Sequence, residues 1–579
     1  MPSHRSLFGA GRLIRVFILA AGGTNGASGA IGAAAAPPPA PEAPAPPARP
    51  TALEQPGDSV GSAGGALPTR PAATITRGPF TSVQVNRNAQ GLDVIGDAGN
   101  ETTITADPHF RNRLAIGWRQ FDTVASSFRQ AGFAYSRDGG RTWRASVMDP
   151  GVFRTDPVLE VDRAGIFFYN TLRVDPYACD LARSFDSGRT WGPQIPAFGG
   201  DKAWMTIDRT GGPGDGAIYQ AWNTAGNQYF PSTFNRSLTG GLTWTAPQEL
   251  PGRPVFGTLA VGPDGELYVA GVPNSSNTTI FRVVRSAVPH DPAVAPVFTP
   301  AVQVNMGGAL RLGVGPNPGG LLGQVWIAVC HAPGPRRGHV YVLCSVDPPG
   351  DDPMDVMFAR STDGGATFSP PVRVNDDAPG TNAWQWFGTM SVAPGGRIDA
   401  VWNDTRAAPG SSRLSQTYAA HSLDGGVTWS ANVALGPAWD SHLGWPSQNK
   451  IGDYYHMISD DVGAHLAYAA TFTGGQDVYY VRIGEYDCNG NGVADPQDIA
   501  GGQSRDCDAD GIPDECEGRA DWNRDGTVAT GDVSAFLGTW FADLVAPRNA
   551  ADYDDDGVTT TMDLSAFLGD WFSALAGGC

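Results

Sequence analysis

The sequence predicts an all-β fold, a six- or seven-bladed β-propeller with seven blades favoured, followed by a small C-terminal module of calcium loops and helices. One eight-residue pattern occurs five times, and internal repeats of this kind are typical of repeat architectures. Between about residues 76 and 484, short apolar segments alternate with glycine-containing turns, as expected for many short strands. After residue 485 the composition changes to aspartate-rich loops of constant spacing.

The repeated pattern reads Ser-x-Asp-x-Gly-x-Thr-Trp in its fullest form. Its five copies cover residues 136–143, 184–191, 237–244, 361–368 and 422–429, with Thr239 in place of Asp and Phe368 in place of Trp in two of them. Ser and Asp side chains can accept hydrogen bonds from nearby amides, and Gly supplies positive φ. The pattern therefore predicts one hairpin turn in each structural unit, with the indole folded back over the turn.

Seven units can be counted along the chain. First strands begin near Glu101, Asp156, Asp201, Val255, Trp386 and Asp453, and a further unit covers about residues 321–346. The interval between the third and fourth copies of the pattern is about twice the usual one, so one unit there has lost its copy, and the last unit also lacks one. A closed ring of four-stranded blades protects the strand edges of such units.

The eight-residue pattern resembles the Asp box, or bacterial neuraminidase repeat, of sialidase-type β-propellers. Six blades remain an alternative, because sialidases have six. In that superfamily the box lies on outer hairpins, away from the active site. The resemblance therefore implies the architecture, and the function has to be sought elsewhere.

The N-terminal part is expected to direct export. Residues 1–36 have a basic start, a short apolar core and an Ala-rich end, as in a signal peptide. Residues 37–75 are a Pro- and Gly-rich segment that we expect to be a disordered linker. No other segment is apolar enough to span a membrane, so the mature protein is expected to be secreted or displayed at the cell surface.

Charge and cysteine content narrow the partners and the compartment. The formal net charge of −19, most of it after Asp487, argues against nucleic acid as a partner. Seven cysteines leave at least one unpaired. An exported protein permits disulfides, and Cys330 with Cys344 and Cys507 with Cys516 are plausible local bridges.

Four segments after residue 485 have the spacing of calcium loops: 487–498, 506–517, 521–532 and 552–563. Ca²⁺ takes six to eight oxygen ligands, and this spacing brings them around a turn with glycine at the sixth position. Aspartate at the last position of three loops predicts weaker binding than glutamate. The predicted metal ligands are Asp487, Asn489, Asn491, Asp495, Asp498, Asp506, Asp508, Asp510, Asp514, Glu517, Asp521, Asn523, Asp525, Asp532, Asp552, Asp554, Asp556, Thr560 and Asp563.

The tail resembles two known calcium modules. Residues 485–518 resemble the acidic, Cys-containing loops of thrombospondin type 3 repeats, which implies a calcium-stiffened stalk. Residues 519–579 contain a duplicated loop and short apolar helix and are similar to dockerin modules, although the spacer 542–551 departs from the compact family form. The dockerin resemblance implies a protein partner recognised through loop positions ten and eleven, here Thr530, Gly531, Thr561 and Met562.

A ligand site is expected at the mouth of the ring, where the innermost strands begin. Carboxylates and aromatic residues gather at these positions, including the pair Asn100 and Glu101. Such groups suit a glycan or glycoprotein ligand; the alternative is that they only cap strand starts. The predicted substrate-binding residues are Asp201, Lys202, Trp384, Trp386 and Asp453.

The resemblance to sialidases implies a catalytic set of an arginine triad, a Tyr nucleophile activated by Glu, and an Asp acid/base. The family's Phe/Tyr-Arg-Ile-Pro motif is only echoed, at residues 153–157. The candidates are Arg154 and Arg406 for the triad, Tyr454 or Tyr455 as nucleophile, and Asp156 as acid/base. The sequence thus predicts a glycan-directed hydrolase of exo-sialidase type; the alternatives are a non-catalytic carbohydrate- or protein-binding propeller and a purely structural protein assembled through its tail.

Overall fold

The computed structural model describes residues 67–224, 227–506, 511–513, 516, 520, 522–523, 528–545, 551–553 and 558–575. The predicted signal peptide (1–36) and the linker up to residue 66 lie outside the described residues. The sheet structure begins earlier than residue 76, because β1 (Thr69–Pro71) lies in the predicted linker and β2 (Thr74–Arg77) begins in it.

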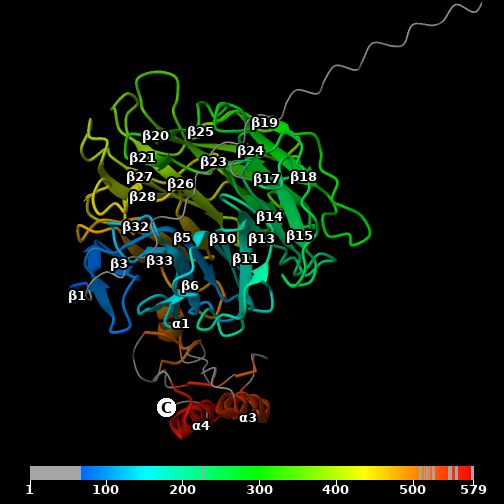
Figure 1. Ribbon diagram of the computed structural model, residues 1–579, viewed down its shortest axis with the longest axis vertical. Helices are drawn as coiled ribbons and strands as arrows, with labels where there is room; N and C mark the ends of the chain where they lie inside the picture. Colours follow the sequence, from blue (N-terminus) through cyan, green and yellow to red (C-terminus); the bar gives the residue numbers. More distant parts are fainter. Residues whose placement is uncertain are drawn as a thin grey trace, which may run out of the picture. The chain divides into compact units, whose positions relative to one another are not determined.

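The chain forms a seven-bladed β-propeller (Figure 1). The blades follow the chain order, and each is an antiparallel sheet with its first strand innermost. Blades one to three consist of β5 (Ala98–Ala106), β6 (Leu114–Phe121), β7 (Gln130–Ser136) and β8 (Arg144–Met148); β9 (Thr155–Val161), β10 (Phe167–Val174), β11 (Tyr177–Ser184) and β12 (Ile195–Pro196); and β13 (Trp204–Ile207), β14 (Ile218–Ala221) and β15 (Phe234–Ser237).

The remaining four blades complete the ring. They consist of β16 (Leu259–Val261), β17 (Leu267–Gly271), β18 (Phe281–Ser286) and β19 (Val302–Val304); β22 (Trp326–Val329), β23 (Val340–Val346), β24 (Asp355–Ser361) and β25 (Val372–Arg373); β26 (Gln385–Val392), β27 (Ile398–Asp404), β28 (Leu414–Ser422), β29 (Val433–Ala434) and β30 (Trp439–Asp440); and β31 (His456–Ser459), β32 (Gly463–Ala470) and β33 (Asp477–Gly484) with β3 (Phe80–Gln84) and β2.

Two short antiparallel strand pairs lie outside the blades. The strand β1 pairs with β4 (Leu92–Val94), and β20 (Leu312–Val314) pairs with β21 (Asn317–Leu321) in the connection between blades four and five. Neither pair was expected from the sequence.

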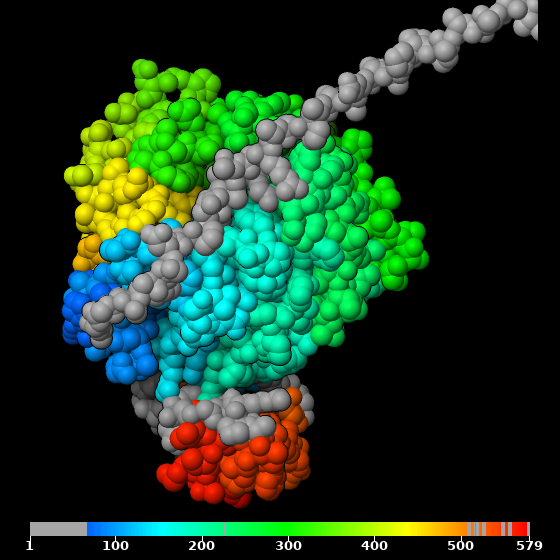
Figure 2. Space-filling model, viewed as in Figure 1, coloured from blue at the N-terminus to red at the C-terminus, as the bar shows by residue number. Residues whose placement is uncertain are grey.

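Closure of the ring joins the two ends of the propeller. The N-terminal strand β3 pairs with β33, with Ser82 opposite Val481 and Gln84 opposite Tyr479. The inner strands contact one another in turn from β5 through β9, β13, β16, β22, β26 and β31 back to β5. Figure 2 shows the blue N-terminal strands against the yellow and orange residues of the last blades. The seven-bladed prediction is therefore confirmed, and the six-bladed alternative is wrong.

The eight-residue repeats form the hairpin turns predicted for them. In the first copy Ser136 Oγ donates to Asp138 Oδ1 at 2.7 Å, and the amides of Gly140 and Thr142 donate to Ser136 Oγ and Asp138 Oδ1. The indole of Trp143 folds back and donates to the Gly140 carbonyl at 2.9 Å. The copies lie after the third strand of blades one, two, three, five and six, so blades four and seven lack one, as the spacing predicted.

The cysteine pairing differs from the expectation. Cys488 and Cys516 form a disulfide with their Cα atoms 5.7 Å apart, whereas Cys179, Cys330 and Cys344 are buried free thiols. The expected pairs Cys330–Cys344 and Cys507–Cys516 are therefore wrong. Proximity in sequence misled the prediction, because the true bridge spans 28 residues and joins two acidic loops.

The tail contains three described helices, α1 (Asp495–Gly501), α3 (Thr530–Val545) and α4 (Thr561–Leu575). The last two pack through Phe536 and Phe567, whose rings stack with centroids 4.2 Å apart. A tryptophan of each helix donates a hydrogen bond to the residue just before the other helix. Trp540 Nε1 donates to the Thr560 carbonyl, and Trp571 Nε1 donates to the Ala529 carbonyl. Among the described residues, no helix is long and apolar enough to cross a membrane.

Candidate functional site

The innermost strands begin with strained, bulged backbone. Glu101, Asp156, Lys202, Phe256 and Phe387 all have positive φ, between 50° and 60°. The pairing of β5, β9 and β26 with the next strand is irregular at these positions. A non-glycine residue with positive φ costs roughly 1–3 kcal/mol, and bulges re-aim side chains. Of these five side chains, those of Glu101, Asp156 and Lys202 meet one another, whereas that of Phe387 packs in the core.

These bulges build a buried charged group, here called the axial cluster. It consists of Glu101, Arg119, Asp156, Asp201, Lys202, Lys450 and Asp453, each less than 9% exposed. The ammonium groups of Lys202 and Lys450 lie 2.5 Å and 2.6 Å from Asp453 Oδ2. Lys202 precedes β13 of blade three, and Asp453 precedes β31 of blade seven. Their contact therefore crosses the ring and places the cluster on its axis.

Neutral donors complete the cluster. The backbone amide of Lys202 donates to Asp156 Oδ2 at 2.7 Å, and Asn223 donates to Asp201 Oδ2 at 2.9 Å. The backbone amide of Leu321, on β21, donates to Asp453 Oδ1 at 2.7 Å. The hairpin of β20 and β21 is therefore tied directly to the charged centre.

Glu101 differs from the other carboxylates of the cluster. Arg119 Nε lies 3.2 Å from its Oε2, but no described residue donates a hydrogen bond of normal geometry to either of its oxygens. Burial raises the pKa of Glu101 to about 8, against the opposing charges of Arg119, Lys202 and Lys450. Glu101 therefore carries a proton near neutral pH.

Asp156 and Asp453 have the opposite protonation. Burial alone would raise the pKa of Asp156, but the Lys202 ammonium and its backbone amide hold that pKa below the usual value. For Asp453, Lys202 and Lys450 overcome burial and hold the pKa well below its usual range. A protonated and an ionised carboxyl group thus share one site, the arrangement that divides acid and base roles.

Four predicted residues, Asp156, Asp201, Lys202 and Asp453, are brought together in the axial cluster. Tyr454 lies beside them. Its hydroxyl donates to the Pro157 carbonyl at 2.9 Å, its ring packs edge-on against Trp204, and burial with the charge of Glu101 raises its pKa well above the ordinary value.

Tyr455 and Trp386 face the core between blades instead of the axis. Both are completely buried, and both pack against Phe387. The Tyr455 hydroxyl donates to the Ala469 carbonyl at 2.5 Å, and Trp386 Nε1 donates to Ser415 Oγ at 3.0 Å. Neither is positioned to meet a ligand on the axis. Trp384 is partly buried and would contact any side chain added at Gly315 of the β20–β21 hairpin.

The two arginines predicted for a sialidase triad do not converge. Arg154 pairs with Asp149 at 2.8 Å and Asp180 at 3.1 Å in blade two. Arg406 follows β27 in blade six, where its ion pairs are with Asp376, Asp377 and Asp404. Each guanidinium is thus already balanced by carboxylates of its own surroundings.

Other cations lie at the axis in their place, and the sequence prediction missed them. Arg119 is a cluster member, and Arg129 is fully buried, donates to Thr155 Oγ1 at 3.2 Å and interacts with the charge of Asp156. Lys450 was also missed, and Glu101 was noticed only as a strand start. A lone arginine in the otherwise uncharged segment 114–121 was the available signal for Arg119.

In the first predicted calcium loop, residues 487–498, two side-chain amides converge on one carboxylate group. Asn491 Nδ2 and Asn489 Nδ2 donate to Asp498 Oδ2 at 2.8 Å and 3.3 Å. Asp495 Oδ2 and Asp498 Oδ1 are buried without a hydrogen-bond donor. This donor set of oxygens, with buried lone pairs left over, fits a hard cation.

The other predicted calcium ligands are only partly described. Asp532 accepts from the amides of Asn523 and Ala529, and Asp563 accepts from those of Tyr553 and Thr560, so the two loops are built alike. Asp506 accepts from the Gly511 amide at 3.0 Å, and Asp552 is buried. Outside the described residues lie Asp508, Asp510, Asp514, Glu517, Asp521, Asp525, Asp554 and Asp556.

No protein-family model and no curated protein matches the chain. Similar solved structures include a protein of unknown function from Dyadobacter fermentans (14% identity, TM-score 0.40, covering 69% of this chain and 98% of that one). The α-L-arabinofuranosidase of Fusarium graminearum (11%, 0.36, 72% and 98%) and the sialidase of Trypanosoma rangeli (12%, 0.34, 72% and 60%) are also similar. Identities and TM-scores this low are not evidence of a shared activity or site.

Proposed function

We propose that the protein is a glycan-directed hydrolase that acts at the axial cluster, with Glu101 as proton donor. The observation that carries this proposal is a buried Glu101 whose pKa is raised to about 8, beside an Asp156 whose pKa is lowered. Glycoside hydrolysis uses such a pair of carboxyl groups, one protonated and one ionised.

The chemistry follows from the two protonation states. Glu101 gives its proton to the glycosidic oxygen as the bond to the anomeric carbon breaks. Water then adds its hydroxyl to the anomeric carbon and returns its other proton to Glu101. Ionised Asp156 stabilises the positive charge that develops on the sugar ring. Lys202, whose ammonium lies 3.9 Å from Asp156 Oδ1 and 2.5 Å from Asp453 Oδ2, fixes both carboxylates in their ionised form.

The charge balance favours an acidic sugar. Arg119, Arg129, Lys202 and Lys450 supply four positive charges. With Glu101 protonated, they are opposed by three carboxylates, those of Asp156, Asp201 and Asp453. The excess positive charge suits a sugar carboxylate, as in an α-sialoside, and the exo-sialidase type is therefore the first activity to test.

Access to the cluster requires a movement of the β20–β21 hairpin. Asn317 Nδ2 donates to the Gly452 carbonyl at 2.8 Å, and the Ile451 amide donates to Asn317 Oδ1 at 3.0 Å. A side chain at Gly320 would lie 2.3 Å from Asp453 Oδ1. We therefore propose that β21 covers the cluster and is displaced when substrate binds.

The test is hydrolysis by the full chain of fluorogenic glycosides, an α-sialoside first and neutral glycosides beside it. We expect Glu101→Gln to lower kcat/KM at least about a hundredfold, because general acid catalysis contributes this much or more. Tyr455→Phe is the control that should stay near the wild-type rate. Turnover lost in Tyr454→Phe and kept in Glu101→Gln would contradict the role of Glu101. Binding without turnover of any glycoside would contradict the hydrolase and support a carbohydrate-binding propeller.

We also propose that the protein is exported, that its tail binds calcium and that the helix pair α3–α4 docks on a protein partner. The specific observation is that Phe541 and Phe572 are 58% and 62% exposed at equivalent positions of the two helices. A duplicated apolar pair fits a partner with an apolar groove. A pulldown from cell-envelope extract should recover a partner with the wild-type protein in calcium. The partner should be absent when chelator is added, and absent with the double variant Phe541→Ala/Phe572→Ala in calcium. Equal recovery in these three samples contradicts docking.

A further inference from the structure

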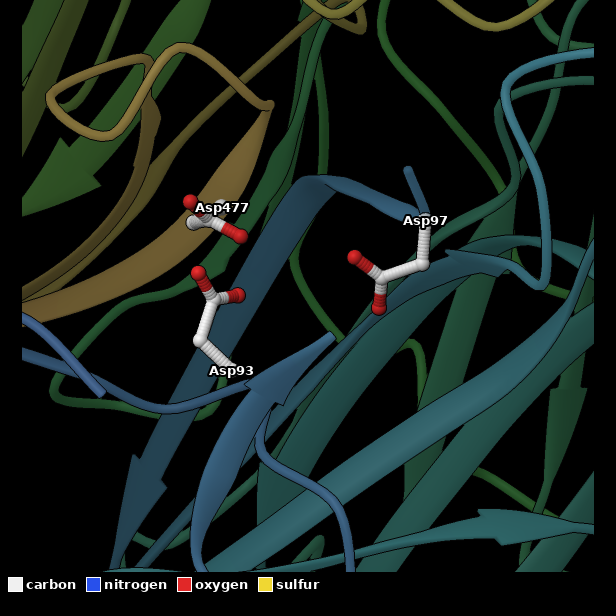
Figure 3. Close-up of side chains that lie close together, drawn as sticks. All are labelled: Asp93, Asp97 and Asp477. Carbon is white, nitrogen blue, oxygen red and sulfur yellow. The ribbon is translucent and has the colours of Figure 1, made fainter. Parts of the chain in front are cut away.

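Three aspartates meet at the seam where the ring closes. Asp93 lies on β4, Asp97 directly precedes β5 of blade one, and Asp477 is the first residue of β33 in blade seven. Each offers a carboxylate oxygen, and these oxygens all lie within 4.8 Å of one another. Figure 3 shows the carboxylates of Asp93 and Asp97 directed toward the space beside Asp477. All three are buried.

The protein supplies little positive charge to this seam cluster of Asp93, Asp97 and Asp477. Arg70 Nε lies 2.5 Å from Asp93 Oδ2, and this is the one ion pair to the cluster among the described residues. Asp97 accepts from the neutral Gln120 at 2.9 Å, and Asp477 accepts from the neutral Asn86 at 3.1 Å. Buried carboxylates are normally paired with a cation or bound to a metal ion.

A second feature points into the same place. Tyr479 is fully buried, and its hydroxyl has no hydrogen-bond partner in the described part of the chain. On β33 its side chain shares a face with Asp477, two residues before it, and with its cross-strand partner Gln84, whose amide donates to Asp93 Oδ1 at 2.7 Å.

We propose that Asp93, Asp97 and Asp477 bind a calcium ion at the seam of the propeller. Calcium takes oxygen ligands at about 2.3–2.6 Å, so ligand atoms around one ion are up to about 5 Å apart, which matches the cluster. Its two positive charges balance the two carboxylates that have no cationic partner. The site is separate from the axial cluster and from the calcium loops of the tail.

The place of the site gives the ion a structural role. The ring is closed by the pairing of β3 with β33 and by further bonds such as that from the Val85 amide to the Val478 carbonyl. The ligands come from the N-terminal segment, the first blade and the last blade. An ion bound there holds both sides of the seam. It stabilises the closed ring, because a ligand that binds only the folded state lowers that state's free energy.

Hydrogen exchange of the full chain tests the proposal, because it reports on the seam separately from the tail. We compare about 2 mM Ca²⁺ with excess chelator and follow the amides of β3 and β33. We expect these amides to exchange at least about tenfold more slowly with calcium. The reason is that local opening of the seam releases the ion, which is unfavourable when the calcium concentration is well above the Kd. Seam amides that exchange equally fast in both conditions overturn the proposal, even where the tail responds to calcium.

Variants assign the ligands. In Asp97→Asn/Asp477→Asn the effect of calcium on β3 and β33 should disappear, and in the single variant Asp97→Asn it should be reduced. Asp208→Asn is the matched control, since Asp208 is a fully buried aspartate of blade three, and it should keep the wild-type effect. Persistence of the full effect in the double variant overturns the ligand assignment. Equal protection by Mg²⁺ overturns the choice of calcium.

Discussion

Replacing Glu101 by Gln should inactivate the protein and, at alkaline pH, stabilise it. The pKa of Glu101 rises from 4.5 to about 8, first because of burial. A carboxyl group whose pKa is raised in the folded state contributes fully to stability below its unfolded pKa, and this contribution is lost as the pH rises through the folded pKa. The wild-type protein therefore loses stability as the pH rises from about 4.5 to about 8. Gln has nearly the shape of protonated Glu and does not titrate, so the variant lacks this loss.

The size of the effect follows from the two pKa values. Between about pH 5 and about pH 9, a shift from 4.5 to about 8 changes the free energy of unfolding by about 4 kcal/mol. At about pH 5 the wild type and Glu101→Gln should differ little, because the folded wild type is protonated there. At about pH 9 the variant should be the more stable protein by about 4 kcal/mol.

The assay is urea unfolding followed by tryptophan fluorescence at both pH values in saturating calcium. A protein of this size can unfold in several steps, so the quantity to compare is the midpoint of the propeller transition. The wild-type midpoint should fall relative to that of Glu101→Gln as the pH is raised. Equal pH dependence of the two proteins would refute the claim that Glu101 is buried as a neutral acid.

Three further predictions concern the frame around the site. Gly426 has φ 80°, and a Cβ added there would lie 2.0 Å from Phe358, so Gly426→Ala should lower the free energy of unfolding by more than about 2 kcal/mol. Gly78→Ala, where the added Cβ meets open space, should lower it by about 1 kcal/mol. Equal shifts of the thermal midpoint in the two variants would contradict the packing of the turn. Alkylation of the denatured, unreduced protein should label Cys179, Cys330 and Cys344 and leave Cys488 linked to Cys516; a Cys507–Cys516 peptide would contradict the structure. Asp498 is the carboxylate on which Asn489 and Asn491 converge. Asp498→Asn should therefore weaken the tightest calcium binding, measured by calorimetry, at least about tenfold. A calorimetric titration that is unchanged in the variant would refute a calcium site in this loop.

The fold could be predicted because its main signal is local. In each repeat the bonds of Asp138 or its equivalents stay within five residues, so the pattern is complete in the sequence. The intervals between repeats then gave the number of blades. Closure by β3 and β33 was not visible, because it pairs residues about four hundred positions apart with no turn to fix the register.

The candidate site was only partly predictable for a related reason. Strand starts indicated Asp156, Lys202 and Asp453, but the choice between Tyr454 and Tyr455 remained open, since adjacent residues of an extended chain point to opposite sides. The structure puts Tyr454 beside the axial cluster and Tyr455 in the core. The bulges with positive φ that re-aim these side chains leave no clear trace in the sequence.

The sequence also does not show which groups surround each side chain in the folded protein. The pKa of Glu101 depends on burial and on Arg119, Lys202 and Lys450, which come from three different parts of the chain. The seam cluster likewise joins Asp93 and Asp477 across nearly the whole propeller. Such arrangements are consequences of the closed ring and cannot be recognised before it is known.

The pH profile of kcat/KM for the α-sialoside or the best glycoside substrate tests directly whether Glu101 is the proton donor. With Glu101 as a proton donor of pKa about 8, activity should fall as the pH rises through about 8. Because the pKa of Asp156 is low, activity should persist well into the acid range. Glu101→Gln should lack turnover across the whole profile. A folded protein without turnover on any glycoside, or a Glu101→Gln variant with the wild-type profile, would contradict the assignment of the axial cluster as a hydrolase site.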